Sequence, residues 1–413
     1  MPPPGSSADA GRAGLSPPGS SADAGRAGLS PPGSSADAGR AGLSPPGSSA
    51  DAGRAGFAPS IDLPSLLSPG VELDPYPLYR VLREDFPLVR DELFGAWLVS
   101  RYVDVRAVLG EVRFGAPGPE GSLGPGVSRR AVAVVDAAVE RTAYVLARRI
   151  AGRREVDLVA EFCGWLPAAA AVAALGLPYG DAARVQEWCR TGLTRVGEAE
   201  GHPELAGLLR PLIARRRAHP GADLLSVLCG ARVDGRPLSD EAVTRLAGNL
   251  LGGGGEATAL ALASFLANLL DHPAQFALVR ARTELIPGAW TESLRRDPPT
   301  PVVLRRATAP IDVGGTTLPE GAVVACLVGA AGRDPYRFAD PDRYDIFRAD
   351  PESLALGGVP RPCLGTTLAA LTARRGLRAL LDVMPGLRWA PGFRPVPQGL
   401  TTRAPRMLLV RRD

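Results

Sequence analysis

The stretch Leu356-Gly-Gly-Val-Pro-Arg-Pro-Cys363-Leu-Gly365 decides how the rest of the sequence is interpreted. Its glycines and prolines predict an irregular loop, and a helical pattern begins directly after Cys363. A thiol at a helix N-terminus meets the positive end of the helix dipole and unpaired N–H groups, and both favour the thiolate. A single thiolate suits the axial position of haem iron better than zinc, although a buried structural cysteine fits the same residues.

This loop resembles the haem-binding signature of the cytochrome P450 family, in which an aromatic residue and glycines precede a basic residue, the cysteine and a further glycine. Arg361, Cys363 and Gly365 match that signature. The resemblance implies haem b, with Cys363 as the axial iron ligand and Arg361 at a haem propionate. Two positions depart from it: Leu356 replaces a phenylalanine that shields the thiolate, and Val359 replaces a glycine.

Two upstream segments follow the order of the family. Glu292 and Arg295 form an E-x-x-R pair that shares one helix face, although an exposed ion pair of little energetic value has the same spacing. In the family an arginine from a later loop completes a structural network around such a pair, and Arg343 is the corresponding residue. Arg305 takes the position of a propionate-binding arginine, and the adjacent Arg306 has the same bidentate chemistry.

An apolar helical pattern at residues 241–270 contains Gly252-Gly-Gly-Gly255. Four glycines inside a helix destabilise it by roughly 2–4 kcal/mol relative to alanine, which predicts a kink or a close approach of another group. A phosphate-binding loop is excluded because no Gly-Lys-Ser/Thr follows. In the family this helix crosses the distal haem face and opens there to hold dioxygen, so the resemblance places Gly253 at the cofactor.

Directly after the glycines come the candidate catalytic residues, Glu256 and Thr258. Glu256 matches an acidic residue of the family, and the next position, usually threonine, is Ala257. Thr258 follows one residue later, which rotates its side chain by about 100° around the helix. Proton delivery through Thr258, through water or through a substrate hydroxyl therefore all remain open.

The first half of the chain departs further from the family. Members usually carry a helix with a His-x-x-x-Arg element after the position of Phe114, where this chain has a Gly/Pro-rich loop at residues 115–126. Arg129 and Arg130 are candidates to replace that element. Residues 187–217 are also short for the two helices that cover the substrate pocket in the family.

Composition excludes several classes of protein. The chain has no lysine, and its 47 arginines are dispersed, which argues against a nucleic-acid-binding arm. No apolar run is long enough to span a bilayer. The cysteines are odd in number and contain no C-x-x-C pair, which argues against a disulfide framework or a zinc site and favours a reducing, cytoplasmic location. They are Cys163, Cys189, Cys229, Cys326 and Cys363.

Periodicity predicts the organisation of the chain. The unit GSSADAGRAGLSPP starts at residues 5, 19, 33 and 47, and it predicts a disordered tail at residues 1–57 before one domain at residues 58–413. Helical patterns cover residues 130–150, 184–196, 204–217, 241–270 and 366–381, and strand patterns cover residues 96–99, 311–313, 323–328 and 407–410. The predicted fold is mainly α with minor antiparallel β. The resemblance implies the triangular helical prism of cytochrome P450, of the bacterial soluble type with a shortened N-terminal half.

The function implied by the resemblance is monooxygenation, by hydroxylation or epoxidation, of a small organic substrate of secondary metabolism. It needs dioxygen and electrons from a ferredoxin and its reductase. Arg374, Arg375 and Arg378 could face such an acidic partner, or they could form a solvated helix face. The alternative is a non-catalytic relative that activates a glycosyltransferase in antibiotic biosynthesis, which the shortened first half favours and the retained Cys363 opposes. A non-functional, partly deleted relative is the third possibility.

Overall fold

The computed structural model describes residues 64–114, 125–192, 203–233, 235–357 and 364–412. The predicted tail, the loop at residues 115–124, Val359, Arg361 and Cys363 lie outside these residues. The helices are α1 (Tyr76–Glu84), α2 (Tyr102–Gly110), α3 (Pro125–Ile150), α4 (Leu166–Ala174), α5 (Ala182–Gly192), α6 (Pro203–Ala218), α7 (Leu224–Cys229), α8 (Asp240–Gly254), α9 (Glu256–Asp271), α10 (Pro273–Ala281), α11 (Ile286–Arg296), α12 (Val328–Ala331) and α13 (Leu364–Val383).

The strands form small sheets. A four-stranded sheet has the order β1 (Leu88–Asp91), β2 (Ala96–Val99), β9 (Val323–Leu327) and β6 (Val302–Arg306). A three-stranded sheet joins β10 (Arg388–Trp389), β13 (Leu409–Arg411) and β3 (Glu155–Asp157). Three strand pairs complete the set: β4 (Arg232–Val233) with β5 (Arg236–Pro237), β7 (Ile311–Val313) with β8 (Thr316–Leu318), and β11 (Pro397–Gln398) with β12 (Ala404–Pro405).

The mainly helical prediction is confirmed, with one correction to the sheet. Strands β2 and β9 pair in parallel, so the largest sheet is mixed rather than antiparallel. A parallel pair needs a long connection between its strands. Here more than 220 residues, including most of the helices, separate Val99 from Val323, a separation that strand periodicity cannot reveal.

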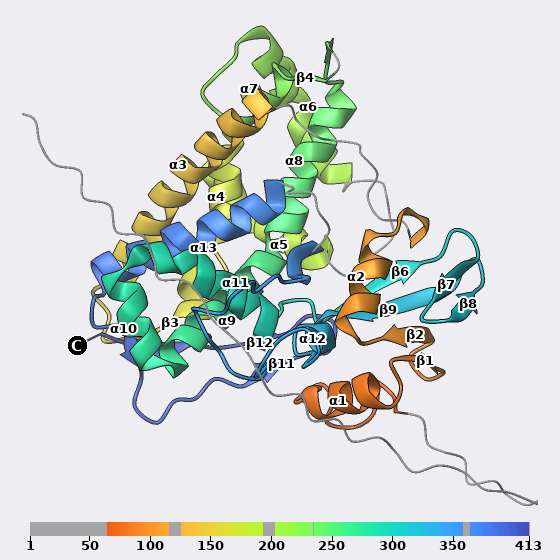
Figure 1. The fold of residues 1–413 in the computed structure, drawn as a ribbon. Coiled ribbons are helices and arrows are strands. Elements are labelled where there is room, and N and C mark those ends of the chain that lie inside the picture. Colours follow the sequence, from red (N-terminus) through yellow and green to blue (C-terminus); the bar gives the residue numbers. More distant parts are fainter. Residues whose placement is uncertain (1–63, 115–124, 193–202, 234, 358–363, 413) are drawn as a thin grey trace, which may run out of the picture. The chain divides into compact units, whose positions relative to one another are not determined.

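The helix α13, which follows the cysteine loop, packs along α3 in the same direction. Near the start of this seam Val135 of α3 shares a buried cluster with Leu368, and near its end Leu146 shares another with Leu377. Figure 1 shows α3, α4, α8 and α13 gathered together, with the four-stranded sheet beside α1 and α2. The seam therefore sets the direction in which α13 leaves the cysteine loop.

The two faces of the four-stranded sheet pack differently because successive side chains alternate. Leu98 and Ala325 lie on the face that packs against Tyr79 and Leu82 of α1. Val324 and Cys326 lie on the other face, within the large cluster that also contains residues of α9, α11 and α13. The second face therefore borders α9, α11 and α13, and the candidate site described below lies on this side of the sheet.

Candidate functional site

The predicted kink in the glycine-rich helix is confirmed at Gly255. Helix α8 ends at Gly254, Gly255 has φ −82° and ψ −89°, and α9 begins at Glu256. The first bond of the new helix runs from the Ala259 N–H to the Gly255 carbonyl, at 3.1 Å. The first N–H groups of a helix have no intrahelical acceptor, and no side chain caps those of α9.

Thr258 lies in this first turn of α9 and is fully buried. A threonine in a helix normally bonds to the carbonyl four residues earlier, which here belongs to Gly254, beyond the break. Within the described part of the chain the Thr258 hydroxyl has no hydrogen-bond partner. Ala257 is also buried, and Glu256 is half-buried. The break therefore leaves a buried hydroxyl available beside an uncapped helix end, while Gly253 lies in the last turn of α8 before it.

The structure distinguishes Arg305 from Arg306, which the sequence could not. The two residues are adjacent on β6, so their side chains point to opposite faces. Arg306 is exposed and donates to the Gly321 carbonyl, at 3.1 Å. Arg305 is half-buried, pairs in register with Val324, and lowers the pKa of the buried Cys326 thiol against the larger, raising effect of burial.

The Arg305 guanidinium is only partly satisfied by the protein. One Nη1–H donates to the Leu304 carbonyl at 3.1 Å, and the buried Nε has no partner among the described residues. A buried guanidinium N–H without an acceptor costs free energy unless an anion or carbonyl completes it. Arg305 therefore suits a carboxylate bound on the core side of the sheet, and it could hold one group of a cofactor there.

The chain on both sides of Cys363 is described. Leu356 is half-buried against the large core cluster, and it has a left-handed backbone with φ 54° and ψ 32°. Helix α13 begins at Leu364, as predicted, and Gly365 is buried in its first turn. Helix α13 is 20 residues long, and the partial positive charge at its N-terminal end favours an anion there.

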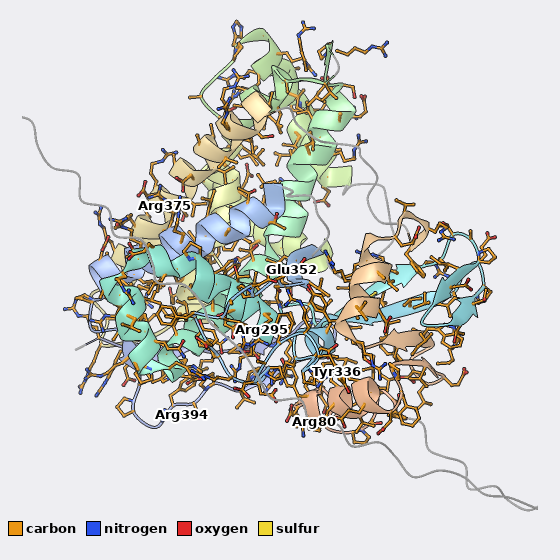
Figure 2. The ribbon with its side chains drawn as sticks, viewed as in Figure 1. Arg80, Arg295, Tyr336, Glu352, Arg375 and Arg394 are labelled. Atoms are coloured by element: carbon orange, nitrogen blue, oxygen red, sulfur yellow. The ribbon has the colours of Figure 1, made fainter. Side chains whose placement is uncertain are left out.

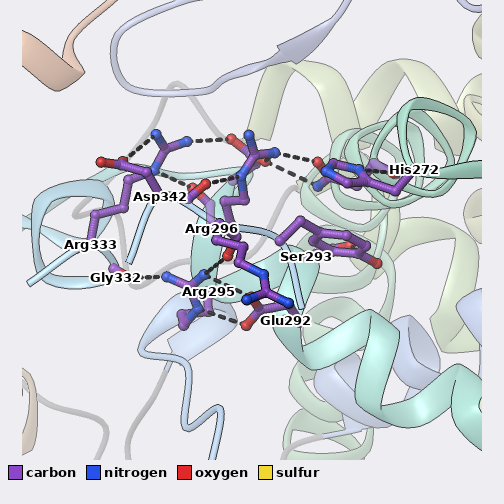
Figure 3. A network of polar contacts seen from close by, with 12 residues as sticks. His272, Glu292, Ser293, Arg295, Arg296, Gly332, Arg333 and Asp342 are labelled. Atoms are coloured by element: carbon purple, nitrogen blue, oxygen red, sulfur yellow. Dashed lines mark hydrogen bonds and ion pairs between the residues drawn. The ribbon is translucent and has the colours of Figure 1, made fainter. Parts of the chain in front are cut away.

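The E-x-x-R pair is fully buried rather than exposed. The Arg295 Nε and Nη2 atoms donate to the two carboxylate oxygens of Glu292 at 2.7 and 2.8 Å, and both side chains are 0% exposed. Arg295 also donates to the carbonyls of Gly332 and Pro341, at 2.6 and 2.8 Å (Figure 3). A buried pair of this kind is stable only when its remaining donors are satisfied, and here backbone from a distant loop satisfies them.

The prediction that Arg343 completes this network is wrong. The Arg343 side chain is 68% exposed and lies 3.8 Å from Asp345. Arg348 takes the place instead: its Nε lies 3.1 Å from both oxygens of Glu292, and the side chain is 10% exposed. Arg343 contributes its carbonyl, which accepts from Arg295 and Arg348. The sequence contained both arginines, but spacing does not show which one turns inward.

A second group of polar residues, partly or fully buried, adjoins this network and was not predicted. Asp297, which directly follows the last residue of α11, accepts from Arg296 at 3.0 Å and from Arg333 at 2.9 Å. Asn268 of α9 donates to the same carboxylate at 3.0 Å, and the Tyr76 hydroxyl donates at 3.3 Å. Asp297 thereby ties α9 and α11 to the loop after α12. An acidic residue directly before two prolines was the available signal.

Electrostatics stabilise this carboxylate. Burial by itself would raise the pKa of the Asp297 carboxyl, but the charges of Arg296 and Arg333, with the hydrogen bonds from Asn268 and Tyr76, outweigh burial and hold that pKa below its usual value. Burial raises the pKa of the Tyr76 hydroxyl to about 12, so this hydroxyl stays protonated and remains a donor.

The arginines of α13 are not equivalent. Arg375 donates to Asp136 of α3 at 2.5 and 2.8 Å and to Glu140 at 2.8 Å (Figure 2). Hydrogen bonds from Arg375 hold the pKa of the Asp136 carboxyl below its usual value. Arg374 lies 3.2 Å from the same carboxylate, and Arg378 is exposed. Arg375 is therefore committed to the α3–α13 seam, which leaves Arg374 and Arg378 as the exposed cations.

The candidates for the missing His-x-x-x-Arg element also have defined positions. Arg129 and Arg130 lie near the start of α3, and both side chains are exposed. Helix α3 packs against α4, α7 and α13. Neither arginine is directed into the buried part of the chain where Arg305 lies.

Comparisons with known proteins point to one family. A family model described as Cytochrome P450 matches residues 210–382. The chain is 30% identical to pulcherriminic acid synthase of Bacillus subtilis, over 86% of this chain and 99% of that protein. It is 33% identical to nocardicin C N-oxygenase of Nocardia uniformis, over 81% of this chain and 95% of that protein.

Solved structures agree with the sequence relatives. The crystal structure of CYP109E1 from Bacillus megaterium, in complex with testosterone, superimposes with a TM-score of 0.69 at 25% identity. The match covers 82% of this chain and 99% of that one. None of the helices in the described residues is long and apolar enough to cross a membrane.

We expect Arg348 and Arg343 to respond very differently to the same substitution. Arg348→Gln leaves the buried Glu292 carboxylate short of a charged donor, so it should lower the free energy of unfolding by about 3 kcal/mol or more. Arg343→Gln should change it by less than about 0.5 kcal/mol, because that side chain is largely solvated. Urea unfolding followed by circular dichroism measures both, and equal losses would contradict the assignment of Arg348.

The lowered pKa of Asp297 predicts a specific loss of stability in acid. The stabilisation is fully present above the unfolded-state pKa of about 4 and is lost as the pH falls through the lower folded-state pKa. Asp297→Asn should therefore lower the melting temperature at pH 7 and flatten its decline between about pH 5 and pH 3. The exposed Asp85→Asn serves as the control, and parallel acid limbs for wild type and Asp297→Asn would refute the prediction.

Proposed function

This chain belongs to the cytochrome P450 family, whose members are haem-binding monooxygenases, and we propose that it oxidises a small secondary metabolite with dioxygen. Two relatives have names that support this substrate class, the nocardicin C N-oxygenase and the cyclomarin C epoxidase of Salinispora arenicola, which is 33% identical. The observation that carries the proposal is the break at Gly255, which leaves the buried Thr258 hydroxyl without a protein partner.

The described residues fit a haem group in two respects. The Arg305 guanidinium lies on the core side of the sheet with an unpartnered N–H, which suits a propionate. The break between α8 and α9 exposes backbone hydrogen-bonding groups in an otherwise apolar environment, which suits a small polar ligand bound next to an apolar cofactor. When bound, the haem would supply the oxidising chemistry, and a cysteine thiolate, here that of Cys363, would hold its iron.

The roles of the residues on the cysteine side follow from their chemistry. Cys363 would supply the thiolate, which the N-terminal end of α13 would stabilise. Arg361 and Arg305 would donate hydrogen bonds to the haem propionates. Leu356 would shield the sulfur from water with an aliphatic rather than an aromatic side chain. Gly365 keeps the first turn of α13 free of side-chain bulk close to the cofactor.

The residues around the break between α8 and α9 would transfer protons and leave room for the cofactor. Gly253 and its neighbours permit close approach of the cofactor, because they carry no side chains. Thr258 holds a proton on Oγ1 at the break and donates it toward the reacting oxygen. Glu256, which is half-buried two residues earlier, would exchange protons with solvent and pass them to Thr258 through water, because side chains two residues apart on a helix do not face each other. Ala257, at the usual threonine position, contributes no hydroxyl, so the relay depends on Thr258 or on water ordered by it.

Electrons come, in this proposal, from a ferredoxin and its reductase. An acidic ferredoxin would meet Arg374 and Arg378 on the exposed face of α13, the helix that follows the iron ligand. Arg375 is excluded from that role by its bonds to Asp136 and Glu140. The free cysteines Cys163 and Cys326, both buried, support a reducing cytoplasmic location, which such a partner would share.

The oxidation proposal is tested by a spectrum. The purified protein, supplied with haem during expression, should show a thiolate-type Soret band after reduction and addition of carbon monoxide. Cys363→Ala should abolish that band because it removes the iron ligand, and Cys229→Ala, a buried cysteine on α7, should retain it. A wild-type protein that takes up no haem would overturn the proposal and favour the alternative, an auxiliary protein that activates a glycosyltransferase.

The proposed proton relay is tested by a substitution of Thr258. Thr258→Val keeps the volume and removes the hydroxyl, so product formed per electron pair should fall about tenfold or more, with release of hydrogen peroxide instead. Thr372→Val is the matched control, because Thr372 is another fully buried threonine with an unpartnered hydroxyl, on α13. Unchanged coupling in Thr258→Val would assign proton delivery to water or to the substrate.

A further inference from the structure

The position of Cys363 depends on how the chain is held on each side of the loop. After the loop, α13 is packed along α3 and bonded to it through Arg375. Before the loop, residues 350–354 form neither helix nor strand, and the short 3-10 helix η5 (Ala355–Gly357) follows. An irregular segment has no hydrogen-bond ladder of its own, so side-chain contacts must determine where it lies.

Arg337 makes the charged contacts to this segment. Its Nη2 atom donates to Asp350 Oδ2 at 2.5 Å and lies 3.7 Å from Glu352 Oε2. Glu352 in turn lies 3.7 Å from the Arg106 Nε of α2. Two arginines from separate parts of the chain thus converge on the segment, in which Figure 2 labels Glu352.

The Arg337 side chain is itself held in place. Its guanidinium lies 5.3 Å from the ring centre of Tyr102 and 5.0 Å from that of Phe338. These two rings meet edge to face, with their centres 5.5 Å apart, and both are buried. Because the arginine is 28% exposed and its guanidinium lies over two aromatic rings, less side-chain entropy is lost when it pairs. This pair therefore orders the chain better than a solvated one would.

Two residues of the segment from Asp350 to Gly357 have a strained backbone. Asp350 has φ 53° and Leu356 has φ 54°, and both are left-handed conformations that ordinary residues adopt at a cost. Such conformations persist only when surrounding contacts impose them. Asp350 is the direct partner of Arg337, and the buried Leu354 next to η5 anchors the far end.

We propose that Arg337 is a positioning residue for the iron ligand: by holding Asp350 and Glu352 it fixes the approach of the chain to Cys363. The proposal rests on the proposed haem-thiolate function. Arg337 touches neither cofactor nor substrate in this role and acts through the backbone of residues 350–357. Its loss should leave the fold intact and change the placement of the sulfur.

The first experiment needs no haem. The full chain, purified without added haem, is treated with iodoacetamide, and alkylation of Cys363 is followed by mass spectrometry. After trypsin the peptide from Ala349 to Arg374 carries Cys363 as its sole cysteine. Arg337→Gln should raise the alkylation rate about fivefold, as expected for loss of a partly buried ion pair. Arg343→Gln, an exposed arginine of the same loop region, should leave the rate unchanged.

The second experiment monitors the bond between the Cys363 sulfur and iron. In haem-loaded protein, Arg337→Gln should shift part of the reduced carbon monoxide spectrum from the thiolate-type to the thiol-type Soret band, at an unchanged melting temperature. Asp350→Asn should give the same shift. Because Asp350 is exposed, this second variant tests the tether even if Arg337→Gln fails to fold. Adding Asp350→Asn to Arg337→Gln should have little further effect, since both remove one interaction.

The outcomes separate the two proposals. Faster alkylation in Arg337→Gln and Asp350→Asn supports the positioning role, even in a protein that takes up no haem, which would overturn only the monooxygenase function. Equal alkylation rates in wild type, Arg337→Gln, Asp350→Asn and Arg343→Gln overturn the positioning role. So does an unchanged Soret band in both variants of the haem-loaded protein.

Discussion

A buried charge that cannot be left unpaired underlies the arrangement of this protein. Glu292 and Arg295 are both fully removed from solvent on α11, and isolating either charge would cost several kcal/mol. Their remaining hydrogen-bonding capacity is met by Arg348 and by the carbonyls of Gly332, Pro341 and Arg343. The loop at residues 332–348 therefore has one permitted course over α11. Gly332 illustrates how close that course is, since an added Cβ would lie 2.1 Å from the Arg295 carbonyl oxygen.

The same loop also contacts the elements that surround the candidate site. It contains Arg333, which joins α9 and α11 through Asp297, and Arg337, which reaches the segment before the cysteine loop. A segment with no regular secondary structure is thus ordered by arginines that donate to carboxylates and carbonyls of its neighbours. Arginine suits this task because its planar guanidinium has five donors and keeps its charge when buried. The absence of lysine from the chain is consistent with that use.

The break between α8 and α9 arises from a different constraint, which the backbone imposes. Four successive glycines weaken the helix, and it breaks at Gly255 with the hydrogen-bond pattern restarting at Ala259. The Thr258 hydroxyl, buried in the first turn after the break, has no partner among the described residues, so an uncapped helix end and an unpartnered donor lie next to each other. Apolar residues of α9 further along pack into the large core cluster, which holds the new helix rigidly below the break.

The sequence by itself determined the features that depend on neighbours a few residues apart: the helix after Cys363, the kink among the glycines, and the Glu292–Arg295 pair. Helical periodicity and glycine content are local properties, and they predicted these features correctly. Tertiary structure alone decided which arginine faces inward: Arg348 rather than Arg343, Arg305 rather than Arg306, and Arg375 at the α3–α13 seam. Arginines have the same chemistry at every position, so only the course of the backbone, which distant strands and helices impose, selects the one that meets a buried acceptor.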